Sequence, residues 1–118
     1  MDAQTFEQLV SDSETRRRAI HQKKTSDYDK SDQDCLSAFR KVAAIANELE
    51  VNGFTGFTGS GIANIEVILK LVRDANLKNS GRPPQNESRM DTIDDLINYV
   101  YLKTGCEVDE QASKEAMK

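Results

Sequence analysis

The chain has 118 residues, enough for one domain with a modest hydrophobic core. Only 37% of the residues are hydrophobic and 31% are charged, and the net charge of −4 argues against a protein that binds duplex nucleic acid. No apolar run approaches the roughly 18 residues that a membrane span requires, so we expect no membrane partner. Residues 1–6 lack the basic and apolar stretches of a signal peptide. The two cysteines are far apart and form no CxxC motif, so we expect a cytoplasmic protein with reduced thiols.

The first expected helix, residues 3–23, has a thin apolar stripe. Phe6, Leu9 and Val10 are spaced three and four residues apart in an otherwise polar sequence. Three consecutive arginines follow at residues 16–18. They form either the solvated face of a weakly docked helix or a basic wall over an anionic ligand.

The second expected helix, residues 33–51, follows a polar connector at residues 25–34. Ser31 or Asp32 can cap its N-terminus. Its apolar residues repeat at helical spacing, which predicts that one stripe faces a core. These residues are Leu36, Phe39, Val42, Ala43, Ala46 and Leu49.

A glycine-rich segment, residues 52–61, ends this helix with four glycines in ten residues. It is either a flexible connector or a weak phosphate cradle, because backbone N–H groups at a helix N-terminus bind anions. The P-loop spacing is missing. If the segment binds a ligand, Phe57 is expected to stack on a base.

The third expected helix, residues 61–77, is capped by Thr58 or Ser60. Lys70 and Arg73 lie on its polar face, where they serve solubility, pair with carboxylates of the fourth helix, or hold a phosphate. A wide apolar face is formed by Ile62, Ile65, Ile68, Leu69 and Val72.

The fourth expected helix, residues 87–104, stops at Gly105, a residue type that favours helix C-termini. Asp91, Asp95 and Asn98 fall in one stripe of this helix. Since like charges one turn apart repel, we expect the stripe to face a cation, a cavity or a second subunit. The alternative is that the acids favour this half of the helix through its dipole.

Most catalytic chemistries have no matching residue set. His21 is the one histidine, which argues against histidine-based metal centres and Ser-His-Asp triads. Neither cysteine has an activating context. Carboxylates with Mg²⁺ remain, with Asp91 and Asp95 as candidate ligands.

Motifs over residues 20–104 resemble the MazG-like all-α nucleoside triphosphate pyrophosphohydrolases, in particular the phage branch called the nucleotide-modification-associated domain. The resemblance implies an all-α fold, a dimer or tetramer, and a nucleotide bound between helices. Active members carry a Glu-x-x-Glu pair on an early helix, which this chain lacks, so the resemblance favours binding over hydrolysis. The motifs are Lys24-x-x-Asp27-Tyr28, Lys70-x-x-Arg73 and Glu87-Ser88-x-x-Asp91-Thr92-x-x-Asp95-Leu96-x-Asn98-Tyr99.

The sequence thus predicts a single all-α domain over residues 1–118, a MazG-like four-helix bundle completed by homo-oligomerisation. It is divided into an N-terminal helix (1–24), a core (25–104) and a tail or short helix (105–118). The expected function is that of a phage protein in the cytoplasm of an infected bacterium, which sequesters a nucleotide-derived immune signal such as a cyclic oligonucleotide or an ADP-ribose derivative.

The alternatives are a Mg²⁺-dependent (d)NTP pyrophosphohydrolase and a helical oligomeric interaction protein without a small ligand. The residues expected to bind the nucleotide are Lys24, Asp27, Tyr28, Phe57, Lys70, Arg73, Glu87, Ser88, Asp91, Asp95, Asn98 and Tyr99.

Overall fold

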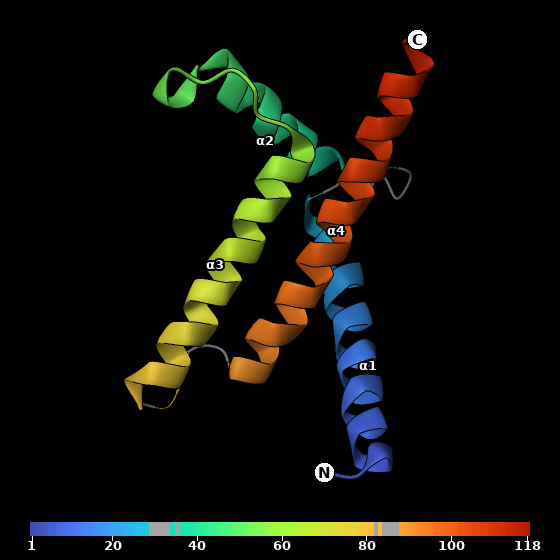
Figure 1. The fold of residues 1–118 in the computed structure, drawn as a ribbon, viewed down its shortest axis with the longest axis vertical. Coiled ribbons are helices and arrows are strands. Elements are labelled where there is room, and N and C mark those ends of the chain that lie inside the picture. Colours follow the sequence, from blue (N-terminus) through green and yellow to red (C-terminus); the bar gives the residue numbers. More distant parts are fainter. Residues whose placement is uncertain (29–33, 35, 82, 84–87) are drawn as a thin grey trace.

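The computed structural model describes residues 1–28, 34, 36–81, 83 and 88–118, and of residues 21 and 23–28 only the backbone (Figure 1). Within these ranges the chain is helical and contains no strand, which confirms the all-α prediction. No helix in the described ranges is long and apolar enough to span a membrane. The helices are α1 (Ala3–Tyr28), α2 (Ser37–Glu48), α3 (Gly59–Ser80) and α4 (Arg89–Ala116), with a 3₁₀ turn, η1 (Val51–Gly53), after α2.

Helix α4 is the centre of the arrangement. Helix α3 runs along it and makes the most extensive contact in the chain, while α1 lies against another side of α4 (Figure 1). Helix α2 packs on α3 near the N-terminal end of α3. The molecule measures 50 × 30 × 26 Å, and its long dimension reflects the ends of α1 and α4 that extend past their neighbours.

Side chains satisfy the free N–H groups at the start of three helices. Asp2 accepts a hydrogen bond from the Thr5 N–H of α1, at 2.7 Å. Thr58 accepts from the Gly61 N–H at 3.1 Å, so the predicted cap of α3 is confirmed. Ser88 and Asp91 form a reciprocal capping box at the start of α4.

The prediction that the fourth helix stops at Gly105 is wrong, since α4 continues to Ala116. Gly105 serves close packing instead, because a Cβ there would lie 3.2 Å from the Leu36 side chain. Beyond it, Cys106 is buried and the Glu110 carboxylate accepts hydrogen bonds from the Ser60 N–H and hydroxyl, at 2.9 and 2.7 Å. These contacts hold the last turns of α4 against α3.

Helix α2 is shorter than the predicted segment 33–51, and it begins at Ser37 without a side-chain cap. The proposed caps Ser31 and Asp32 lie outside the described residues. The predicted stripe is only partly confirmed. Leu36 and Ala43 are buried and Phe39 and Ala46 are half-buried, whereas Val42 and Leu49 are exposed.

Helix α3 turns its polar side inward. Ala63 is fully buried at the contact with α4, and Lys70 and Arg73 lie beside it on the α4 side. Four apolar residues on the opposite side, Ile65, Ile68, Leu69 and Val72, are each about half exposed. The predicted apolar face therefore exists, but in this chain it faces away from α4.

An ion pair joins α3 to the start of α4 and gives a pH prediction. The Arg89 guanidinium donates to both Asp74 oxygens, at 2.8 and 3.2 Å, and this hydrogen bonding lowers the pKa of Asp74 below its ordinary 3.8. Because the folded pKa is the lower one, the pair stabilises the fold fully above pH 3.8 and loses this effect as the pH falls through the folded pKa. We expect Asp74→Asn to lower the urea midpoint at neutral pH and to have no effect in strong acid. An equal difference at both pH values would contradict this assignment.

Candidate functional site

The acidic residues of α4 face different neighbours. Asp91, half-buried, accepts from the Ser88 N–H and hydroxyl, at 3.2 and 2.9 Å. Asp94 faces α1 and Asp95 faces α3. Of the predicted row, Asp95 therefore lies beside a residue of opposite charge, while Asp91 bonds to the start of its own helix, where the helix dipole also favours a carboxylate.

Asp94 is the most buried carboxylate of the described chain, with no exposed surface. It accepts hydrogen bonds from the Ser13 hydroxyl at 2.5 Å and from Arg16 Nε at 2.7 Å, both on α1. The hydrogen bond that Arg16 donates to the Asp94 carboxylate raises the pKa of Arg16 above its ordinary value. The pairing of Asp94 with Ser13 and Arg16 was not predicted from the sequence, because only the approach of α1 brings these residues together.

Asp95 is 6% exposed and lies 3.5 Å from the Lys70 Nζ. The predicted pairing of Lys70 with a carboxylate of the fourth helix is thereby confirmed. Arg73, three residues further along α3, donates from its Nε to the Thr92 hydroxyl at 3.2 Å. These contacts join the polar side of α3 to α4. They also engage Lys70 and Arg73, for which binding a phosphate was one of the predicted roles.

The candidate magnesium ligands do not form a suitable donor set in this arrangement. Asp91 is engaged at the helix start and Asp95 faces an ammonium group, which competes with a cation for the same oxygens. Among the described side chains, no three His, Cys, Asp or Glu residues come close enough to share a metal ion. We derive no chemistry from Mg²⁺ here.

Several other predicted ligand residues lie apart from one another. Phe57 packs edge-on against Phe54, with ring centroids 4.9 Å apart, and its backbone is held by the Asn47 side chain at 2.8 and 2.9 Å. Tyr99 is half-buried and packs edge-on against Phe39 at 6.4 Å. Glu87 and the side chains of Lys24, Asp27 and Tyr28 lie outside the described residues.

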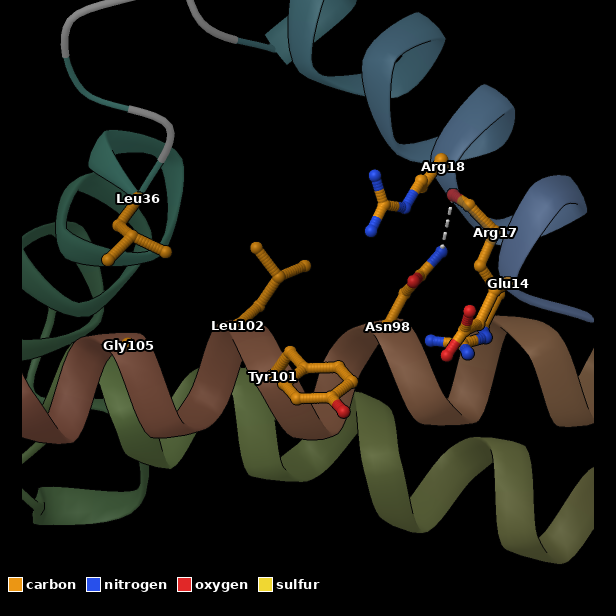
Figure 2. Close-up of a pocket in the computed structure, with 8 residues that line it drawn as sticks. All are labelled: Glu14, Arg17, Arg18, Leu36, Asn98, Tyr101, Leu102 and Gly105. Carbon is orange, nitrogen blue, oxygen red and sulfur yellow. Dashed lines mark hydrogen bonds between the residues drawn. The ribbon is translucent and has the colours of Figure 1, made fainter. Parts of the chain in front are cut away.

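A groove of about 430 Å³ lies between α1, the start of α2 and α4 (Figure 2). Among the described side chains that line it, Asn98 is the one that was predicted to bind the ligand, and its side-chain amide donates to the Arg17 carbonyl at 3.1 Å. That hydrogen bond holds α1 against α4 at the polar end of the groove. The lining consists of Glu14, Arg17, Arg18, Leu36, Asn98, Tyr101, Leu102 and Gly105.

The two ends of this groove differ in chemistry. Leu36 and Leu102 form an apolar end, and the side chains of α1 form a charged end (Figure 2). Arg18 is exposed and extends into the space between α1 and α4, and no hydrogen bond joins it to another described side chain. Arg17 is half-buried and donates from Nε to the Ser13 hydroxyl at 3.2 Å, which fixes its position.

Tyr101 lies beside the groove, next to Leu102 of its apolar end, and is 68% exposed. Its position places an aromatic ring beside the groove with one face available for stacking. Tyr101 was not among the residues predicted from the sequence to bind the ligand. The signal in the sequence that pointed to this groove was the run of arginines at 16–18. Consecutive residues on a helix point in different directions, so the three arginines can contact different neighbours.

The groove therefore combines arginine donors, one carboxylate, an amide, an aromatic ring and an apolar end in a volume typical of small-molecule sites. No protein family model, no curated protein and no solved structure matches the chain.

Proposed function

We propose that the α1–α4 groove binds a nucleotide-derived ligand and that the protein acts by holding this ligand rather than by converting it. The observation that carries the proposal is the placement of Arg17 and Arg18 at one end of the groove and of Tyr101 beside its apolar end. A nucleotide has the same division into an anionic part and an aromatic base.

The arginine end suits phosphate. A guanidinium group offers several N–H donors in a plane and binds phosphate through paired hydrogen bonds. Arg17 is held in place by Ser13, while Arg18 keeps its donors available to a ligand. The chain as a whole is acidic, so attraction of an anion to the groove depends on these neighbouring arginines and not on the net charge.

The tyrosine end suits a base. Stacking of a base on an aromatic side chain contributes about 1–3 kcal/mol and tolerates different bases. The Leu36 and Leu102 side chains extend the apolar surface next to the ring. The Glu14 carboxylate and the side-chain amide oxygen of Asn98 provide acceptors for an exocyclic amine or a ribose hydroxyl.

The engaged carboxylates favour binding over hydrolysis. Asp91 and Asp95 have partners within the fold and do not line the groove, so neither is placed to activate water on a phosphate bound there. A protein of this kind would lower the free concentration of its ligand, in line with sequestration of a nucleotide signal. The MazG-like arrangement of helices and a homo-oligomeric state remain parts of this proposal.

The proposal is tested by isothermal titration of the full chain against adenosine mono-, di- and triphosphate, a cyclic dinucleotide, a cyclic trinucleotide and ADP-ribose. We expect micromolar or tighter binding of at least one of them, with the ligand recovered unchanged. Arg18→Ala and Tyr101→Ala should each weaken that binding about 10- to 100-fold, because each removes one of the two recognition elements.

Lys78→Ala is the matched control, since it removes an exposed cation at the end of α3 that does not line the groove. Its affinity should equal that of the unaltered chain. Absence of binding by every compound at high micromolar protein would reject the proposal. Equal losses of affinity in Lys78→Ala and in Arg18→Ala would show that Arg18 acts only through general charge attraction, which would contradict a specific phosphate site in the groove.

A further inference from the structure

We infer that α1 is a strap that opens and closes the α1–α4 groove while α3 and α4 stay packed together. The closed position depends on a short part of α1, residues 13–17, which we call the docking turn. Opening of α1 is a property of the chain alone, whereas the effect of a bound ligand on it rests on the proposed function. The groove is complete only in the closed position.

Among the described side chains, the polar contacts that join α1 to α4 are concentrated in the docking turn. The Ser13 hydroxyl and Arg16 Nε donate to the Asp94 carboxylate at 2.5 and 2.7 Å. The Arg17 carbonyl accepts from the Asn98 amide at 3.1 Å. Because five consecutive residues make little more than one helical turn, α1 is fastened to α4 at one level of the fold.

The apolar residues of α1 add little to this contact. Phe6, Leu9 and Val10 are 56%, 38% and 38% exposed, and the N-terminal turns of α1 diverge from α4 (Figure 1). Among the α1 side chains that the structure describes, only Ser13 is buried. A helix in a folded protein normally obtains most of its stability from an apolar face packed on its neighbours, and the described part of α1 buries no such face.

Helix α3 is attached to α4 in a different way. Its contact with α4 is far more extensive than that of α1, and Ala63 is fully buried within it. When α1 leaves α4, in contrast, water replaces the hydrogen bonds of Ser13 and Arg16 and hydrates the Asp94 carboxylate, which the closed position buries. Local opening of α1 therefore costs less free energy than unfolding of the α3–α4 pair.

The groove depends on the closed position because its lining comes from both helices. Arg17 and Arg18 belong to α1, and Tyr101 belongs to α4 (Figure 2). Arg17 also donates from Nε to the Ser13 hydroxyl at 3.2 Å, so it is bonded to the same serine that docks α1 on Asp94. A ligand that contacts the arginines and the tyrosine together bridges the two helices, binds only the closed position and shifts the equilibrium toward it.

Amide hydrogen exchange of the full chain, followed by mass spectrometry at low urea concentrations, tests the opening without any ligand. Relative to their intrinsic rates, we expect residues 9–20 to exchange at least about 10-fold faster than residues 63–77. Their dependence on urea should be weaker, because opening exposes less surface than global unfolding. Equal rates with equal urea dependence would overturn the inference, as would exchange of α1 at the rate of an unstructured peptide.

A pair of serine substitutions on α1 tests the docking turn. Ser13→Ala removes a donor to Asp94 and should raise the equilibrium constant for opening of α1 about 5- to 30-fold. Ser11→Ala is the matched control, because Ser11 is exposed on the same helix and the change in helix propensity is the same. The control should leave the opening constant unchanged or slightly lower. Equal changes in the two variants would overturn the assignment of the docking turn.

The effect of a ligand is measured with ADP-ribose as the probe, at about 30 times its apparent Kd. Exchange of residues 9–20 should then slow about 30-fold, because only the closed position binds. Unchanged exchange in the presence of bound ADP-ribose would overturn the coupling between the strap and the groove. If no nucleotide binds, the proposed function fails, whereas exchange of the ligand-free chain and of its serine variants still decides whether α1 opens.

Discussion

Replacing Asp94 with alanine is expected to lower the free energy of unfolding by about 2–4 kcal/mol. The Asp94 carboxylate is fully buried and accepts hydrogen bonds from Ser13 and Arg16 at 2.5 and 2.7 Å. Its removal leaves the buried Ser13 hydroxyl without this acceptor, and such a loss costs more than the net strength of an ordinary hydrogen bond. Urea unfolding followed by circular dichroism measures the effect.

The same variant should release α1 from α4. The contact between these helices is the smaller of the two that α4 makes with helices α1 and α3, and the hydrogen bonds from Ser13 and Arg16 to Asp94 form much of its polar part. We therefore expect faster amide exchange throughout residues 9–20 and loss of ligand binding in Asp94→Ala, because the groove needs both helices. Asp109→Ala is the control, since Asp109 is 58% exposed and its pairing with Arg40 is worth at most about 1 kcal/mol. Unchanged exchange in α1 would show that other contacts position this helix.

A second large loss of stability is expected when the Lys70–Asp95 ion pair between α3 and α4 is broken. Lys70→Met removes the cation beside Asp95, whose side chain is 9% exposed, and should cost about 1–3 kcal/mol because the carboxylate stays buried. The double variant Lys70→Met with Asp95→Asn removes both charges and should recover most of that loss. A double-mutant cycle by chemical denaturation gives the coupling between the two residues.

Lys103→Met provides the comparison for this cycle. Lys103 pairs with Glu107 one turn along α4 at 2.6 Å, but both side chains are substantially exposed. We expect a change below about 0.5 kcal/mol there. If Lys70→Met were equally mild and the cycle showed no coupling, Asp95 would depend on another partner, and its inward orientation would need a different explanation.

Orientation of the acidic row shows where prediction from sequence reached its limit. The helical stripe correctly placed Asp95 toward the fold and toward Lys70, because both residues lie on regular helices with a known period. The same reasoning did not predict the role of Asp94, because its partners lie 78 and 81 residues away in the chain. A contact between residues this far apart leaves no local pattern in the sequence, so the Ser13–Arg16–Asp94 cluster was not predictable from periodicity.

The candidate site followed the same division. The arginine run at residues 16–18 was noted as a possible basic wall, and the structure sends Arg16 to Asp94 while Arg17 and Arg18 line the groove. Neither Tyr101 nor Leu102 was predicted to bind a ligand, because α4 is apolar on several sides and its sequence does not show which side remains uncovered. Of the predicted ligand residues whose side chains the structure describes, Asn98 alone lines the groove.

Local patterns in the sequence were enough to predict the helical class, to limit the cap of α3 to Thr58 or Ser60 and to outline the apolar stripes, because propensity, capping and periodicity act over a few neighbouring residues. Tertiary structure decided which stripe meets which neighbour. It turned the apolar side of α3, with Ile68 and Val72, away from α4. It also extended α4 past Gly105 through contacts with Leu36 and α3, and it brought α1 to Asp94. These outcomes depend on buried ion pairs and close packing between distant segments, which no local pattern specifies.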